Sequence, residues 1–244
     1  MSFMELPSAL LHLWNFSDHL LLGAVVTLKA AAGGMLLAIT IGLVGALGRL
    51  SGIAAISFAV RGYIVLFRSI PEVIVVLALY FGGSMLWSRF LNAIGYTGYH
   101  ELDPLIGGIV ALGLTFGAYA TEIFRGAILA IPKGEIEAAR AFGMKRHQRF
   151  WRIIWPQMGR FALPGLGNLF LVLIKDTSLL SVIAVQEVMR ETRIAIGYTA
   201  QPFTFYMAAA FLYLAMTTIA LYGLRALERR ASIGQRTVAS HEIF

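Results

Sequence analysis

The sequence predicts an all-α, polytopic membrane protein with about five transmembrane helices. Its 244 residues are 58% hydrophobic and only 14% charged, and the mean hydropathy of +0.75 is far above that of a soluble globular domain. Long apolar runs alternate with short segments that hold most of the Lys and Arg residues. A chain of this length favours one transmembrane domain covering residues 1–244.

Five apolar runs are long enough to cross about 30 Å of hydrocarbon, which takes roughly 20 residues of helix. We expect these spans at about residues 20–47, 70–87, 104–130, 161–185 and 203–224. The first run is interrupted only by Lys29. The second is part of a longer apolar stretch, residues 53–87, which is too long for one straight crossing and contains Pro71. We therefore divide it into an interfacial arm at residues 53–69 and a crossing that starts near residue 70.

The connecting segments differ in their content of basic residues. Residues 131–160 hold Lys133, Arg140, Lys145, Arg146, Arg149, Arg152 and Arg160, and the C-terminal segment holds Arg225, Arg229, Arg230 and Arg236. In contrast, residues 88–103 and 186–202 hold only Arg89 and the pair Arg190 and Arg193. Because short basic loops resist translocation, residues 131–160 and the C-terminus are predicted to be cytoplasmic, with the N-terminus outside.

Several classes of protein are disfavoured by composition. The chain has no cysteine, and its five histidines are scattered without the spacing of metal ligands, so we expect no metal site. The net charge of +7 is explained by basic loops beside membrane spans, without nucleic acid. No Gly-x4-Gly-Lys-Ser/Thr phosphate loop occurs, so this chain is not expected to bind ATP or another cofactor.

The segment "KGEIEAARAFGMKRHQRFWRIIWPQ" (residues 133–157) concentrates charge in an otherwise apolar chain. Its alanines favour a helix from Glu137 to Arg152, in which Gly143 allows a turn or a close approach, and Pro156 marks the return to the membrane. By composition alone, a basic amphipathic helix resting on anionic lipid headgroups is as good an explanation as a partner-binding helix.

The spacing within this segment resembles a known signature. Glu137-Ala138-Ala139, Gly143, Ile153 and Pro156 are spaced EAA-x3-G-x9-I-x-x-P, as in the permease subunits of ATP-binding-cassette (ABC) importers. "GAYATEIFRGAILAIPKGEIEAARAFGM" (117–144), "PQMGRFALPGLGNLFLVLIKDTSLLSVI" (156–183) and "RSIPEV" (68–73) look like the polar amino-acid branch, in particular the Q-type permeases of histidine/lysine-arginine-ornithine and opine importers. The likeness covers most of residues 20–230. Ser69 and Trp155 depart from the family's usual Gly and Leu.

The resemblance implies a type I importer permease fold in a bacterial inner membrane, with residues 131–160 as the coupling loop. It implies that Glu137, Ala138, Ala139, Arg140 and Gly143 belong to a cytoplasmic coupling helix that sits in a cleft of the ATPase. The implied partners are two ATPase chains that carry ATP and magnesium, an external or periplasmic substrate-binding protein, and a second permease subunit. That subunit is expected to be a related M-type chain, and a second copy of this chain is the alternative.

The substrate pathway is sought among polar residues in the spans, because an ionisable side chain is costly in a bilayer and usually faces a cavity or a partner. The candidates are Glu72, Tyr119, Glu122, Asn168, Lys175, Asp176 and Ser178. Lys175 could attract a carboxylate, and Glu72 or Asp176 an amine or guanidinium. Against these roles, Glu122 can simply pair with Arg125 three residues later, and small polar residues often serve only helix packing.

Together with these residues, the resemblance implies the import of a polar, basic amino acid (histidine, arginine, lysine or ornithine) or an opine, with ATP hydrolysis on another chain. One alternative is a stand-alone, gradient-driven amino-acid carrier or channel subunit, which would need no EAA segment. Another is an intramembrane enzyme. We disfavour it because the sequence offers no nucleophile and base, or paired catalytic carboxylates, at suitable spacing.

Overall fold

The computed structural model describes residues 11–231, and every secondary-structure element in this range is a helix. In chain order these are α2 (Ser17–Arg49), α3 (Ala54–Ser69), α4 (Glu72–Ala93), α5 (Pro104–Leu129), α6 (Lys133–Ala141), α7 (Arg146–Arg149), a π-helical turn (Phe150–Ile154), α8 (Trp155–Asp176), a 3-10 helix (Thr177–Ile183), α9 (Val188–Thr199) and α10 (Pro202–Ala231). The prediction of an all-α fold is confirmed. The two chain termini and Arg236, on which the predicted orientation partly depends, lie outside the described residues.

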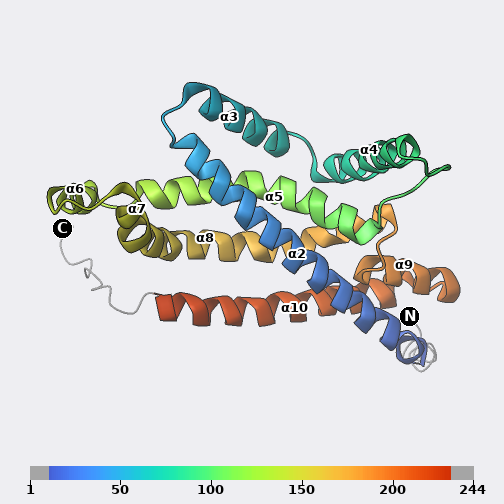
Figure 1. The fold of residues 1–244 in the computed structure, drawn as a ribbon. Helices are drawn as coiled ribbons and strands as arrows, with labels where there is room; N and C mark the ends of the chain where they lie inside the picture. The colour runs from blue at the N-terminus through green and yellow to red at the C-terminus, as the bar shows by residue number, and fades with distance from the viewer. Residues whose placement is uncertain (1–10, 232–244) are drawn as a thin grey trace.

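Five helical segments of the described chain are long and apolar enough to cross a membrane, and each predicted span falls on one of them. They are Ser17–Arg49, Glu72–Ala93, Pro104–Leu129, Arg146–Ile183 and Pro202–Ala231. Figure 1 shows α5, α8 and α10 running side by side, with α2 crossing them. The hairpin of α6 and α7 lies at one end of these helices, where α10 also finishes, and α9 lies at the other end.

The break predicted at Pro71 is present between α3 and α4. Ile70 and Pro71 are extended, with ψ angles of 136° and 132°, and α4 begins at Glu72. A proline disfavours helical geometry in the residue before it, which explains why the long apolar stretch divides here. The crossing starts at residue 72 and runs to residue 93, six residues beyond the predicted end.

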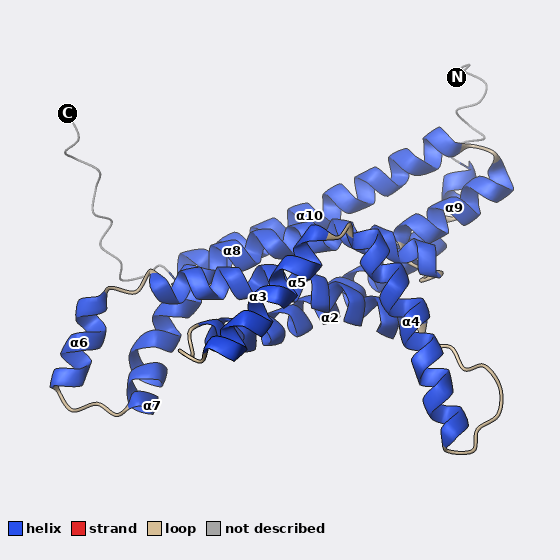
Figure 2. Cartoon of the chain, turned by 90° about the horizontal axis from the view of Figure 1, so that it is seen from above, coloured by secondary structure: helices blue, strands red, loops and turns tan. Residues whose placement is uncertain are grey.

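The helix predicted from Glu137 to Arg152 is interrupted at Gly143, where the sequence allowed a turn. Helix α6 ends at Ala141, and Gly143 adopts the left-handed conformation with φ +73°. The Met144 N–H donates to the Ala139 carbonyl and the Gly143 N–H to the Arg140 carbonyl, which is the hydrogen-bond pattern of a helix-ending Schellman motif. Gly143 therefore terminates the helix. The turn that follows joins α6 to α7, and these two helices form the α6 hairpin (Figure 2).

The fourth span and the segment after it also differ from the prediction of 161–185. Helix α8 begins six residues earlier, at Trp155, and its α-helical part ends at Asp176, where the chain tightens into the 3-10 helix. Residues 186–202 were expected to form a loop but contain α9. This helix was missed because only 12 residues of mixed polarity form it, well below the length of a membrane span.

Helices α2 and α5 pack most closely where α2 carries glycines. A Cβ atom added at Gly42 would lie 2.5 Å from the Ala120 Cβ, and one added at Gly45 would lie 2.5 Å from the Thr121 Oγ1. Apolar side chains gain little from leaving lipid, so membrane helices associate through van der Waals contact, which small residues permit. Gly42 and Gly45 thus serve close packing of α2 on α5.

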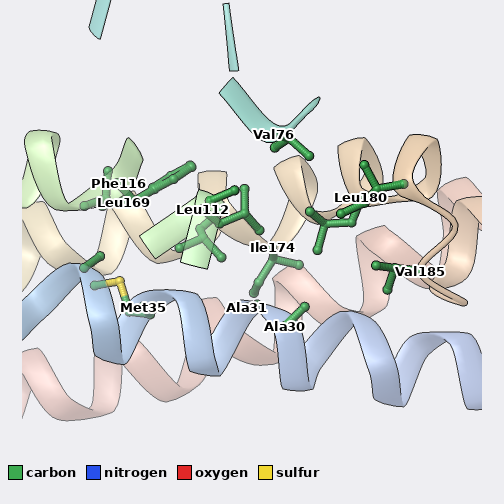
Figure 3. Close-up of a cluster of buried hydrophobic side chains, with 14 of the residues drawn as sticks. Ala30, Ala31, Met35, Val76, Leu112, Phe116, Leu169, Ile174, Leu180 and Val185 are labelled. Atoms are coloured by element: carbon green, nitrogen blue, oxygen red, sulfur yellow. The ribbon is translucent and has the colours of Figure 1, made fainter. Parts of the chain in front are cut away.

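The main core lies between α2, α5 and α8 (Figure 3). The buried side chains labelled there are Ala30, Ala31, Met35, Val76, Leu112, Phe116, Leu169, Ile174, Leu180 and Val185. Large apolar side chains on the outer faces are exposed instead, among them Leu36 of α2 (69%) and Ile219 of α10 (73%). An apolar exterior of this kind fits a hydrocarbon surrounding.

A buried carboxylate ties α9 to two spans. Glu187 is fully buried and accepts hydrogen bonds from the backbone N–H groups of Met189 (2.8 Å) and Arg190 (2.9 Å) and from the Tyr213 hydroxyl (2.9 Å). The adjacent Val188 N–H donates to the Thr27 Oγ1 at 3.4 Å. Burial raises the pKa of the Glu187 carboxyl above its ordinary value, although its donors favour the charged form. Glu187 is thus the cap of α9 and its anchor to α10.

Replacing Glu187 by Ala is expected to lower the free energy of unfolding by about 1–3 kcal/mol, because buried donors lose their acceptor. Glu187→Gln keeps one carbonyl acceptor, so its free energy of unfolding should fall by less. Thermal unfolding of the full-length protein in detergent measures both. Equal melting temperatures for Glu187→Ala and the unmodified protein would contradict the anchoring role.

Candidate functional site

Helices α3, α4, α5 and α8 line an open cavity of about 590 Å³. Its lining combines charged, aromatic and small residues from segments far apart in the sequence: Arg68, Glu72, Phe116, Tyr119, Glu122, Ile123, Gly165, Asn168, Leu169, Val172 and Asp176. Five of the seven predicted pathway residues are in this set. The break at Pro71 makes this possible, because it lets the end of α3 and the start of α4 reach the cavity together.

Three of the lining side chains interact through the Tyr119 ring. The Arg68 guanidinium lies over this ring, 4.9 Å from its centroid, in a cation–π contact. The Tyr119 hydroxyl donates to the Glu72 Oε1 at 3.4 Å. Glu72 is in the first turn of α4, where the helix dipole stabilises a negative charge. One wall of the cavity therefore presents an aromatic face with a cation and an anion beside it.

Glu122 forms an ion pair within its own helix. The Arg125 NH2 and Nε lie 2.7 Å and 3.0 Å from the Glu122 Oε2, so one carboxylate oxygen accepts two hydrogen bonds. The pairing considered from the i, i+3 spacing is therefore present. Glu122 lines the cavity, and its charge there is largely balanced by Arg125.

The α8 wall is where the cavity opens to the surface. Asn168 is exposed and Val172 is 36% exposed, one turn apart on the same face of the helix. Asp176 lines the cavity near the end of α8. Lys175 and Ser178 are not among the lining residues: Lys175 is exposed on α8, and Ser178 is half-buried in the 3-10 helix.

The cavity has the groups needed to bind a cation. Glu72 and Asp176 are carboxylates with no ion pair among the described residues, and a carboxylate binds an ammonium or guanidinium group through charge-assisted hydrogen bonds. The Tyr119 ring already holds the Arg68 guanidinium, so the carboxylates are the groups left to bind a ligand. Arg68 was missed as a site residue by sequence reasoning. Its signal was its position four residues before Glu72 in "RSIPEV", on the other side of the proline break.

The second candidate site is the α6 hairpin, which extends from the end of the helical body (Figure 2). The residues expected to contact an ATPase are Glu137, Ala138, Ala139, Arg140 and Gly143. All of these are exposed except Ala139, which is 4% exposed. Phe142, at the tip, is 87% exposed. A large apolar side chain and charges of both signs thus protrude together.

One face of α6 attaches the hairpin to the membrane helices. Ile136 packs in a cluster with Phe124, Ile131 and Met158, and Glu135 accepts a hydrogen bond from the Gln157 side chain. Movement of α6 would therefore be passed directly to the ends of α5 and α8. A partner that binds the hairpin could in this way change the positions of helices that line the cavity.

Membrane-spanning helices around a polar cavity, with an exposed hairpin coupled to them, define a membrane permease. Residues 38–233 match the family described as "Binding-protein-dependent transport system inner membrane component". The match covers most of the chain, and the protein belongs to this family.

Curated relatives align along nearly their whole length. The histidine/lysine/arginine/ornithine transport system permease protein of Escherichia coli is 42% identical over 222 residues, which cover 91% of this chain and 97% of the relative. The octopine transport system permease protein of Agrobacterium tumefaciens is 38% identical over 221 residues, covering 91% and 92%. The arginine ABC transporter permease protein of Haemophilus influenzae is 39% identical, covering 91% and 99%.

Solved structures share the fold. A crystal structure of an amino acid ABC transporter with histidines has a chain that superposes with a TM-score of 0.76 at 29% identity, covering 90% of this chain and 97% of that one. An inward-facing structure of the MetNI methionine ABC transporter superposes with a TM-score of 0.66 at 17% identity, covering 95% and 99%. The fold is therefore that of ABC importer permeases, as predicted.

Proposed function

We propose that this permease imports a basic amino acid (histidine, arginine, lysine or ornithine) or an opine, driven by ATP hydrolysis on separate ATPase chains. The observation that carries the substrate class is the cavity, in which the Glu72 and Asp176 carboxylates outnumber the one cation, Arg68, that is held on the Tyr119 ring. The relatives named for histidine, lysine, arginine, ornithine and opines support the same class.

The α6 hairpin is the contact for the ATPase, and ATP and magnesium bind on that partner. Glu137, Ala138 and Arg140 form its exposed face, Gly143 sets its turn, and the buried Ala139 lets α6 pack closely on the membrane helices. The basic residues of the hairpin and those at the end of α10 lie at the same end of the molecule, so we assign this end to the cytoplasm. The N-terminus is then outside.

The cavity requires a second subunit for closure. It is open along the exposed Asn168 and Val172 face of α8, and a charged cavity is unfavourable against lipid. A second permease subunit, a related M-type chain or another copy of this one, covers that face. A substrate-binding protein delivers the solute at the α9 end.

The test is uptake into proteoliposomes by this chain purified with its co-expressed partners. Radiolabelled arginine, histidine and glutamine are compared with and without ATP, and with an ATPase variant that lacks the phosphate-loop lysine. We expect ATP-dependent uptake of arginine or histidine that this variant abolishes. Uptake that persists without ATP would indicate a gradient-driven carrier, and equal uptake of glutamine would refute the basic substrate class.

Glu72→Gln is expected to reduce uptake of a cationic substrate by about tenfold or more, because a charge-assisted contact is lost while the side chain keeps its size. Concentration-dependent uptake of arginine measures the effect. Glu101→Gln, an exposed carboxylate on the loop between α4 and α5, is the matched control. Unchanged arginine uptake by Glu72→Gln, with normal assembly, would remove Glu72 from the substrate site.

A further inference from the structure

A second cavity, of about 430 Å³, lies between the α6 hairpin and the end of α2. Three arginines line it: Arg140 from α6, and Arg146 and Arg149 from α7. No acidic residue is among its lining. The cavity lining therefore holds three guanidinium groups and no carboxylate.

The arginines differ in how they are held. Arg149 is half-buried, and its NH1 donates to the Met144 carbonyl at 2.8 Å, which fixes one cation beside the turn between α6 and α7. Arg140 and Arg146 are exposed, and within residues 11–231 neither forms an ion pair. Two guanidinium groups thus remain free to bind an anion in the fork geometry that suits phosphate.

The floor of this cavity is apolar and belongs to the ends of membrane helices. Leu47 and Leu50 come from the end of α2, and Ile128 comes from the end of α5. These positions mark the boundary of two spans. A ligand with a charged group and an apolar part would contact the arginines and this floor together.

Aromatic residues beside the cavity place it at the level of lipid headgroups. Phe150 lines it and contacts Trp151 and Trp155, with ring centroids 5.2 Å and 6.1 Å away. Trp151 is 60% exposed and Trp155 is 40% exposed. Tryptophan is enriched where the hydrocarbon meets the headgroups, because its ring is amphipathic.

We propose that this cavity binds the phosphodiester headgroup of an acidic phospholipid. The arginines bind the phosphate, and the acyl chains leave over the floor of Leu47, Leu50 and Ile128. A free phosphate would leave that apolar floor uncovered. An acidic side chain of the ATPase would not account for the floor being continuous with the membrane spans. Because α6 and α7 form the cavity walls, the bound lipid braces the hairpin against α2 and α5.

The test uses contact quenching of tryptophan by brominated lipids in nanodiscs that contain the full-length chain. Trp14→Phe and Trp87→Phe leave Trp151 and Trp155, beside the cavity, as reporters. We expect brominated phosphatidylglycerol to quench them at a lower mole fraction than brominated phosphatidylcholine. The preference is the ratio of the mole fractions at which the two lipids quench equally. It should fall by about tenfold for each arginine replaced in Arg140→Gln/Arg146→Gln.

The matched control is Lys133→Gln/Lys145→Gln, which removes the same charge from the same segment but does not alter the cavity lining. The preference should persist in this control. Equal losses in the two double variants would overturn the site in favour of general attraction to a charged surface. Relief of the quenching by excess inorganic phosphate would overturn the lipid as occupant. The readout does not depend on transport, so it stands apart from the proposed substrate.

Discussion

Replacing Glu137 by Lys is expected to abolish ATP-driven uptake while leaving the fold intact. Glu137 is exposed on α6 and has no hydrogen bond or ion pair with the described residues, so its replacement removes nothing from the permease itself. At a docked interface, a reversed charge costs several kcal/mol through like-charge contacts. The loss should therefore appear as detachment of the ATPase.

Two measurements separate this effect from misfolding. Copurification of the ATPase with the permease reports docking, and the thermal unfolding temperature of the permease reports the fold. Glu101→Lys, on the loop between α4 and α5, reverses an exposed charge away from the hairpin and should retain uptake. Normal ATPase binding and uptake by Glu137→Lys would contradict a docking role for α6.

Gly42→Ala is expected to produce the largest loss of stability. The added methyl group would lie 2.5 Å from the Ala120 Cβ and 2.8 Å from the Ala120 carbonyl carbon, closer than van der Waals contact allows. A flexible side chain can move aside, but the contacted backbone of α5 cannot move without displacing the helix. We expect a loss of about 1–3 kcal/mol or more, with a separation of α2 from α5.

Gly223→Ala in α10 is the matched control, because nothing lies within 4 Å of a Cβ added there. Alanine favours a helix over glycine by about 1 kcal/mol, so this variant should melt at the same or a higher temperature. Thermal unfolding of the purified full-length proteins gives the comparison. Equal melting temperatures for Gly42→Ala and Gly223→Ala would contradict close α2–α5 packing.

The α6 hairpin shows which structural features a local sequence pattern can predict and which it leaves open. The spacing of Glu137, Gly143 and Pro156 identified the segment and its resemblance to a signature, but it did not decide whether Gly143 makes a turn, which the structure shows it does. Glycine is compatible with both a helix and a left-handed turn, and the choice depends on the hydrogen bonds of neighbouring residues. Helix α9, missed because it is short and of mixed polarity, is likewise held by a distant residue, since Tyr213 donates to its Glu187 cap.

The sequence by itself determined the class of fold, the number of spans and the break at Pro71. Each of these depends on a local property, either the length of an apolar run against the thickness of the hydrocarbon or the geometry of proline. Only the tertiary structure decided that Arg68, Tyr119 and Asp176 line one cavity and that Lys175 lies outside it. Arg68, Tyr119 and Asp176 come from three different helices, and their proximity depends on how these helices pack. That packing is set by contacts between residues far apart in the chain, such as Gly42 against Ala120, which a local pattern does not encode.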